Sequence, residues 1–195
     1  MTKLWLVRHG HTNYNLEGRY NGVTDIPLSE YGMQQAQVLA EELAKNGVGY
    51  AAVYSSSKLR ARQTAAILNR GLELPVSVDE RLREIDLGVW EGMSYGDVDR
   101  KYPREVEGRR TNAAHVRAPG GESALEVAQR MVAAVNDIVQ AHPQGDVIVV
   151  AHGVALATLI LTAQGLPLDA VSDSMPPHAQ AVVLEWEGVK QVVEG

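Results

Sequence analysis

The sequence predicts an α/β fold, a three-layer sandwich in which a mostly parallel central sheet carries helices on both faces. Short apolar or β-branched runs alternate along the chain with longer segments whose apolar residues recur at helical spacing. No repeat, low-complexity tract or linker interrupts this alternation. With 195 residues, the chain has the length of one domain with at most a small excursion on its surface.

The predicted strands are short and end in polar residues. A C-terminal pair of apolar runs, split by Glu187-Gly188, is typical of a hairpin. The four strand candidates that precede it alternate with helices, which favours parallel pairing. The candidates are residues 4–8, 51–54, 75–78 and 146–151, followed by the two hairpin arms at 179–186 and 189–193.

Helical patterns fill most of the intervening sequence. The first helix follows Ser29, a natural N-cap, and ends at Asn46-Gly47. The segment 93–121 has weak periodicity and many charges, so we expect an excursion over one edge of the sheet. The other predicted helices cover residues 58–69, 123–142 and 154–163.

The composition excludes several functional classes. Lys and Arg number 18 against 24 Asp and Glu, so the net charge of −6 provides no general attraction to nucleic acid or to an anionic membrane. The absence of cysteine excludes disulfides, thiolate nucleophiles and cysteine–zinc sites. The first apolar run stops at Arg8 and is too short for a signal peptide or a membrane span. We therefore expect a cytoplasmic protein. A homodimer is a possible oligomeric state.

Basic and imidazole side chains gather at the carboxyl ends of three predicted strands. Arg8 and His9 end the first strand, and His152 follows the fourth. Arg60 and Arg62 lie one turn inside the helix that follows the second. Because ligands bind at the carboxyl ends of strands in such sheets, we expect these groups to form one cationic pocket in an acidic protein.

A phosphate ester is the substrate that such a pocket fits. A guanidinium group can bind two phosphoryl oxygens at once through two parallel hydrogen bonds, and the helix that begins at Gly153 adds its N-terminal dipole. A neutral imidazole among them can attack phosphorus and carry the phosphoryl group covalently. The leaving alkoxide then needs a proton, for which Glu84 is the candidate, although a solvated charge run is the alternative interpretation of its surroundings.

Six blocks of sequence occur in order along nearly the whole chain. The first reads Arg-His-Gly-His-Thr-Asn-Tyr-Asn and matches the pattern R-H-G-x-T-x-x-N. The six blocks are residues 8–15, 28–36, 55–65, 82–92, 119–123 and 151–153. Together they resemble the histidine phosphatase (phosphoglycerate mutase-like) superfamily, and residues 87–92 are more similar to its phosphatase branch. The resemblance implies one domain of this type over residues 1–195, with the excursion at about 93–121.

The resemblance also implies a phosphomonoesterase that needs neither a metal ion nor a cofactor and acts on a small phosphorylated metabolite. In that reading His9 is the nucleophile that becomes phosphohistidine. Glu84 donates the proton to the leaving group and then activates water. The residues implied to hold the phosphoryl group are Arg8, Asn15, Arg60 and His152, of which Arg8, Arg60 and His152 also act in catalysis.

Two alternatives are open for the same pocket. Cofactor-dependent phosphoglycerate mutases of the family use the same catalytic groups, but the short segment 93–121 and the short tail after the hairpin favour the phosphatase. A non-catalytic phosphate-binding module is the other alternative, and it would be expected to lack catalytic residues that are all present here.

A serine hydrolase is a third alternative. Residues 92–96 match G-x-S-x-G around Ser94, and Asp146 and His152 follow in the chain order of a hydrolase triad. However, the strand that should precede such a nucleophile is interrupted by Asp86, Gly88 and Glu91. The serine hydrolase hypothesis is therefore disfavoured.

Three further residues have open roles. His11 lies two residues after His9, so the two rings would share one side of an extended strand and could bind a metal ion. The intervening Gly10 is expected to break that geometry, which disfavours a metal site. Arg62 is assigned to the rim of the site or to a salt bridge. His178 stands where the resemblance implies an asparagine, which leaves a substrate contact at this position in doubt.

Overall fold

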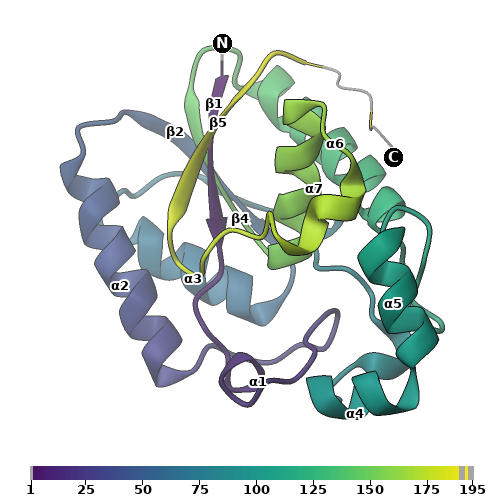
Figure 1. The fold of residues 1–195 in the computed structure, drawn as a ribbon. Helices are drawn as coiled ribbons and strands as arrows, with labels where there is room; N and C mark the ends of the chain where they lie inside the picture. The colour runs from purple at the N-terminus through teal and green to yellow at the C-terminus, as the bar shows by residue number, and fades with distance from the viewer. Residues whose placement is uncertain (1, 189–191, 193–195) are drawn as a thin grey trace.

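A computed structural model describes residues 2–188 and 192 of the chain, and its centre is a five-stranded sheet in the order β3-β2-β4-β1-β5 (Figure 1). Strands β1 to β4 are parallel, and β5 lies antiparallel to β1 at one edge. The strands are β1 (Thr2–Arg8), β2 (Tyr50–Ser56), β3 (Val76–Asp79), β4 (Asp146–Ala151) and β5 (Ala181–Trp186).

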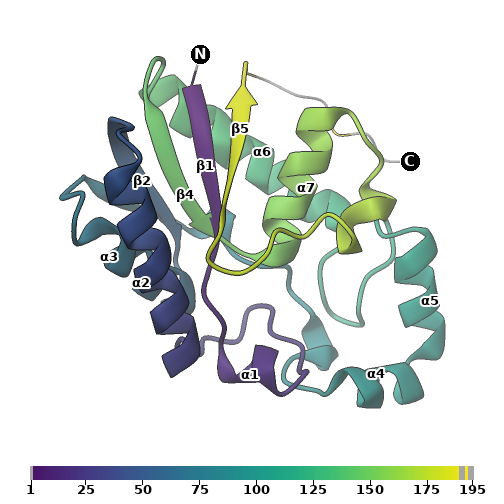
Figure 2. The same ribbon diagram turned by 60° about the vertical axis from the view of Figure 1, so that its left-hand side comes forward.

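Helices cover both faces of the sheet. The pair α2 and α3 packs on one face and the pair α6 and α7 on the other, as Figure 2 shows from the side. This arrangement confirms the predicted α/β sandwich with a mostly parallel sheet. The helices are α1 (Asn13–Leu16), α2 (Glu30–Lys45), α3 (Leu59–Asn69), α4 (Tyr95–Lys101), α5 (Pro103–Thr111), α6 (Ala124–Ala141) and α7 (Gly153–Gln164).

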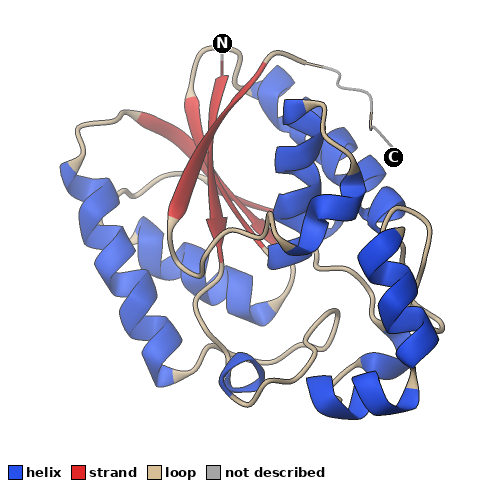
Figure 3. Cartoon of the chain, in the orientation of Figure 1, coloured by secondary structure: helices blue, strands red, loops and turns tan. Residues whose placement is uncertain are grey.

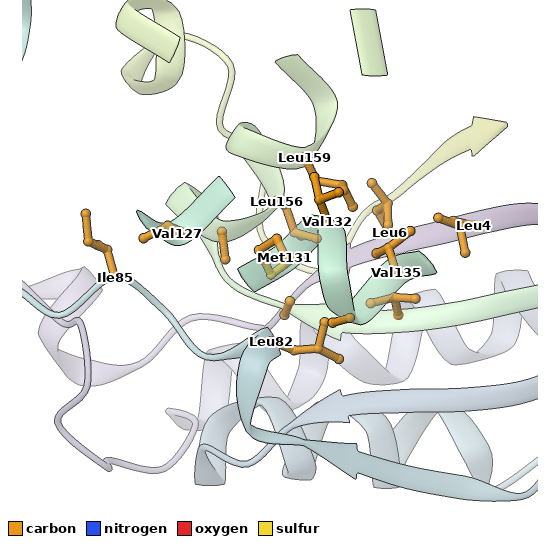
Figure 4. Packing of buried hydrophobic residues seen from close by; sticks show 14 of the residues in the cluster. Leu4, Leu6, Leu82, Ile85, Val127, Met131, Val132, Val135, Leu156 and Leu159 are labelled. Carbon is orange, nitrogen blue, oxygen red and sulfur yellow. The ribbon is translucent and has the colours of Figure 1, made fainter. Parts of the chain in front are cut away.

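The alternation of side chains along β1 divides the core between the two faces. Leu4 and Leu6 are fully buried against α6 and α7, where Met131 and Leu156 are among their neighbours (Figure 4). Val7 points to the other face and belongs to the cluster formed with α2 and α3. Burying each such side chain stabilises the fold by about 1.5–3 kcal/mol.

Short polar side chains fix where two of the helices begin. The Ser29 hydroxyl accepts the Gly32 amide at the start of α2, and Ser123 forms a capping box with Glu126 at the start of α6. The predicted strands and helices are confirmed to within two residues at each end. The first hairpin arm is β5, which pairs with β1, whereas residues 189–191 and 193 of the second arm lie outside the described residues.

The segment from residue 93 to 121 contains α4 and α5, which lie with α1 beyond the carboxyl ends of the parallel strands (Figures 1 and 3). Its weak periodicity follows from its position, because α5 buries no residue fully and α4 buries only Val98. Within the described part of the chain, no helix is long and apolar enough to span a membrane.

Candidate active site

His9 is a buried imidazole directly after the carboxyl end of β1. Its Nδ1–H donates to the Gly10 carbonyl at 2.7 Å, and its Nε2 accepts from the Arg60 Nε–H at 3.2 Å. Because a carbonyl only accepts and a guanidinium only donates, these partners assign the proton to Nδ1 and the lone pair to Nε2. Burial, with the Arg60 charge, holds the pKa of His9 well below its ordinary value. The ring is therefore neutral, the form in which Nε2 can act as a nucleophile.

A second buried imidazole, His152, lies beside the first because β1 and β4 are adjacent and parallel. The two ring centroids are 5.1 Å apart. Nε2 of His152 bonds to the Ser56 hydroxyl at 2.8 Å, whereas its buried Nδ1 has no hydrogen-bond partner among the described residues. Burial and the Arg60 charge hold the pKa of His152 well below its ordinary value. Although His152 precedes α7, its side chain makes no capping bond and is free to serve the site.

Arg60, the second residue of α3, is completely buried. Its Nη1 donates to the Thr24 carbonyl at 2.8 Å and its Nη2 to the Gly22 carbonyl at 2.6 Å, while Nε faces His9. Burial lowers the pKa of Arg60 to about 10, and the Glu84 charge opposes that shift. The guanidinium is thus charged at neutral pH and fixed with one N–H directed at the nucleophile.

Arg8, the last residue of β1, provides the second guanidinium. Its Nη1 donates to the Pro176 carbonyl at 3.1 Å, but its buried Nε lacks a partner within the described chain. A Cβ added at Gly153 would lie 3.0 Å from Arg8 Cζ, so the glycine that opens α7 lets the guanidinium pack against the helix. A buried N–H without an acceptor is costly, and a bound anion would satisfy it.

Glu84 lies buried at the N-terminus of α7. Its Oε1 accepts the main-chain amides of Ile85 at 2.9 Å and Ala155 at 3.0 Å, and its Oε2 accepts that of Val154 at 3.1 Å. These three bonds fix the carboxylate next to the helix that starts after His152. The interpretation of Glu84 as part of a solvated charge run is therefore wrong.

A cavity of about 380 Å³ is lined by Arg8 and Glu84, whereas His9, Arg60 and His152 are not among its lining residues. Its volume lies within the range of small-molecule sites. Arg109 from α5 reaches its wall, with its guanidinium carbon 5.7 Å from the centre of the Trp90 ring and a buried Nη1 that has no partner in the described residues. Residues of the wall include Arg8, Asn15, Glu84, Trp90, Arg109 and Arg110.

Comparison with known proteins identifies the family. The sequence profile of the "Histidine phosphatase superfamily (branch 1)" matches residues 4–195. The chain belongs to this superfamily.

Its relatives include a phosphatase and a protein named as a mutase. The Proteus mirabilis protein named "Probable phosphoglycerate mutase GpmB" is 35% identical over 86% of this chain and 77% of its own. The structure is similar to Bacillus stearothermophilus YhfR (TM-score 0.87, 38% identity, 100% of this chain and 96% of that one). It is also similar to the mycobacterial glucosyl-3-phosphoglycerate phosphatase Rv2419c (TM-score 0.84, 31% identity, 95% of this chain and 99% of that one).

Two other residues that were predicted near the site, Asn15 and Arg62, lie in different surroundings. Asn15 lines the cavity, but its Oδ1 accepts the Thr12 amide at 3.0 Å and the Thr12 hydroxyl at 2.9 Å, which closes the capping box of α1. Arg62 is exposed and lines a separate hollow beside Ser55 and β3, away from the cavity. Asn15 thus shapes the loop after the nucleophile, whereas Arg62 lies outside the site.

The G-x-S-x-G match around Ser94 is explained by helix capping. The Ser94 hydroxyl accepts the Asp97 amide at 3.1 Å and donates to its carboxylate at 2.9 Å, so it begins α4. A short 3₁₀ helix at Gly88–Trp90, not a buried strand, precedes it. The serine hydrolase alternative therefore lacks its nucleophile elbow.

His11 and His178 pack against each other next to the nucleophile, with ring centroids 4.0 Å apart. The Nδ1–H of His178 donates to the His9 carbonyl at 2.8 Å. Burial, followed by the Arg8 charge, lowers the pKa of His178 to about 3. Among the described residues, no group of three or more His, Cys, Asp or Glu side chains is arranged to hold a metal ion.

Sequence reasoning missed Arg109, Ser56 and Glu91. Arg109 lies in a segment without a clear pattern, where only the tandem Arg109-Arg110 distinguished it from other surface charges. Ser56 ends β2 and was visible as a strand-end residue, but its bond to His152 depends on the strand order. Glu91 lies in a segment whose pattern indicates only an interrupted strand, so nothing in the sequence around it signals a role.

Proposed function

We propose that the protein is a phosphomonoesterase that hydrolyses a small phosphorylated metabolite through phosphohistidine at His9, without a metal ion. Nε2 of His9 attacks phosphorus as the ester P–O bond breaks, and the leaving oxygen takes a proton from Glu84. A water molecule then loses a proton to Glu84, its oxygen bonds to phosphorus, and the P–N bond breaks. Inorganic phosphate leaves and His9 is again neutral.

One observation carries this proposal: a neutral imidazole with its lone pair on Nε2 lies among buried donors that lack acceptors. The Arg8 Nε and the His152 Nδ1 are both without partners in the described chain. Three phosphoryl oxygens would accept from these groups and from Arg60, each charge-assisted bond contributing about 1.5–3 kcal/mol. These contacts favour a phosphoryl group at His9 over a neutral ligand.

The cavity supports a finer statement about the substrate, namely that its non-phosphate part carries a second negative charge. Arg109 has lost much of its hydration, since burial lowers its pKa, yet its Nη1 has no acceptor among the described residues. A carboxylate or a second phosphate would satisfy that donor. The name of the mycobacterial relative, a glucosyl-3-phosphoglycerate phosphatase, is consistent with such a substrate.

Substitution of Arg109 tests the acidic substrate. For R109M we expect the KM for 3-phosphoglycerate to rise at least about tenfold, as for a lost charge-assisted bond, with the KM for p-nitrophenyl phosphate changed less than about threefold. The control is R104M, an exposed arginine on the same helix, which should change neither value. An equal loss on both substrates in R109M would contradict the second-charge assignment.

Phosphoglycerate mutase activity is the second candidate, favoured by the 35% identity to the protein of that name. A mutase returns the phosphoryl group to the substrate, whereas a phosphatase transfers it to water. Incubation with 3-phosphoglycerate separates the two. We expect released inorganic phosphate, whereas conversion to 2-phosphoglycerate without phosphate release would establish the mutase.

A further inference from the structure

Glu91 lies at the end of the short 3₁₀ helix before α4. Its carboxylate accepts four hydrogen bonds from one loop, residues 22–24. Its two oxygens accept the main-chain amides of Gly22 at 3.2 Å, Val23 at 2.9 Å and Thr24 at 3.1 Å. The Thr24 hydroxyl donates to it at 2.5 Å, and the Leu87 amide at 3.2 Å. One carboxylate thus fixes three consecutive amides of the loop at residues 22–24.

The carbonyls of the same loop hold Arg60. Gly22 and Thr24 present their N–H groups to Glu91 and their C=O groups to the guanidinium, which donates at 2.6 and 2.8 Å. The Nε of Arg60 then donates to His9 Nε2 at 3.2 Å. A continuous set of hydrogen bonds therefore runs from Glu91 through the loop and Arg60 to the nucleophile.

We infer that Glu91 is a positioning residue for the phosphoryl transfer: it fixes the loop whose carbonyls orient Arg60, the guanidinium that faces the nucleophilic Nε2 of His9. The inference rests on the proposed function, because it assigns Glu91 a role in that reaction. Glu91 touches neither the cavity nor His9, so it acts only through the loop and Arg60.

Two independent observations agree with this role. A Cβ at Gly22 would lie 2.3 Å from Glu91 Oε1 and 2.3 Å from the Ile85 carbonyl, so the loop approaches the carboxylate as closely as only glycine allows. The Glu91 charge also opposes the lowering of the Arg60 pKa by burial, together with the larger effect of Glu84. Glu91 therefore supports both the place and the charge of the guanidinium.

A double-mutant cycle between Glu91 and Arg60 tests the inference. In E91Q the amide NH₂ faces main-chain N–H donors, so the loop must shift. With p-nitrophenyl phosphate we expect kcat to fall roughly 10- to 100-fold and KM to change less than about threefold, as for a displaced catalytic group. In an R60K background the same substitution should lower kcat less than about twofold, because residues that act as a unit are not additive.

A matched control removes a carboxylate that has only a structural role. Glu126 accepts the Ser123 amide at 2.9 Å in the capping box of α6, so E126Q should lower the Tm while kcat stays unchanged. The variant T24V, which removes only the hydroxyl donor to Glu91, provides the same cycle if E91Q does not fold. For T24V we expect a several-fold loss of kcat that disappears in the R60K background.

The remaining outcomes separate this inference from the proposed function. The positioning role would be overturned if E91Q or T24V lowered kcat in the R60K background by the same factor as in the wild type. It would also be overturned if either variant lowered the Tm and left kcat unchanged. If the wild type shows no phosphatase activity, the proposed function fails. The coupling from Glu91 through Arg60 to His9 is then tested by ¹⁵N NMR of the His9 ring. We then expect E91Q, but not E126Q, to shift the His9 Nε2 resonance, and an unchanged resonance overturns the coupling.

Discussion

At His9, two hydrogen-bond partners of opposite kind decide the chemistry of a single ring. The Gly10 carbonyl fixes the proton on Nδ1 and the Arg60 guanidinium occupies the position at Nε2 that phosphorus must enter. The substrate therefore displaces a hydrogen bond and offers its own oxygens to the donor. This exchange keeps the guanidinium satisfied in both states, which limits the cost of burying it.

The tautomer of His9 is directly measurable. Because burial and the Arg60 charge hold its pKa well below the ordinary value, we expect the ¹⁵N spectrum to show the neutral Nδ1–H form throughout the range from pH 8 to pH 5. Protonation of His9 with a midpoint near 6.5 would contradict the assigned environment.

Glu84 has a role that depends on the leaving group. In E84Q no proton can be donated, so we expect the rate with an alkyl phosphate to fall roughly 10²- to 10⁴-fold. The loss with p-nitrophenyl phosphate should be much smaller, because p-nitrophenolate leaves without a proton. Equal losses on both substrates would remove Glu84 from the acid role and leave it only its place at the start of α7.

Among the helices, α7 connects the sheet to the site, because it begins directly after His152 and binds Glu84 with its first amides. The sequence predicts a helix over residues 154–163, and most of these residues are buried. Its contact with Glu84 could not be predicted, because the two segments are 70 residues apart and meet only through the strand order. Sequence thus predicts where such helices begin and end, but not what their ends bind.

The cap of α6 tests the stability of an element apart from catalysis. Ser123 accepts the Glu126 amide and is buried away from the cavity. We expect S123A to lower the free energy of unfolding by about 1 kcal/mol, which corresponds to a Tm shift of roughly 2–4 °C. Differential scanning calorimetry with a parallel activity assay checks this, and a loss of kcat at unchanged Tm would be the contrary result.

Taken as a whole, the protein has a net charge of −6 and encloses a site with the buried Arg60, the partly buried Arg8 and neutral histidines. Residues 8, 9 and 152 could be assigned to one site from the sequence, because they follow strands whose parallel pairing the pattern predicts. Glu84 could be named as a carboxyl candidate from the residues alone, and the family resemblance then implied its acid and base roles. Arg109 and Glu91 could not be found in this way, since their contacts are made by irregular segments without periodicity.

Three histidines, His9 and His152 in the core and the half-buried His178, make the stability of the molecule depend on pH. His9, His152 and His178 have pKa values below 6.5 when folded, that of His178 being about 3. Below pH 6.5 the unfolded chain therefore binds protons that the native state does not. The free energy of unfolding should fall as pH decreases, by up to about 1.4 kcal/mol per pH unit for each histidine.

Urea unfolding at pH 7.5, 6 and 5 measures this slope. The variant H178N keeps a donor for the His9 carbonyl and removes one titrating ring, so its slope between pH 6 and pH 5 should be smaller by about one proton. A stability that stays constant between pH 7.5 and pH 5 would show that these rings are not buried in neutral form.

The most direct test of the phosphohistidine mechanism is to stop the reaction with a phosphorylated substrate by rapid quench and to locate the phosphate by mass spectrometry. We predict an acid-labile, base-stable phosphate on His9, formed at a rate no slower than turnover and absent in H9A, which should have no activity. A fully active H9A protein, or phosphate on another residue, would contradict the account.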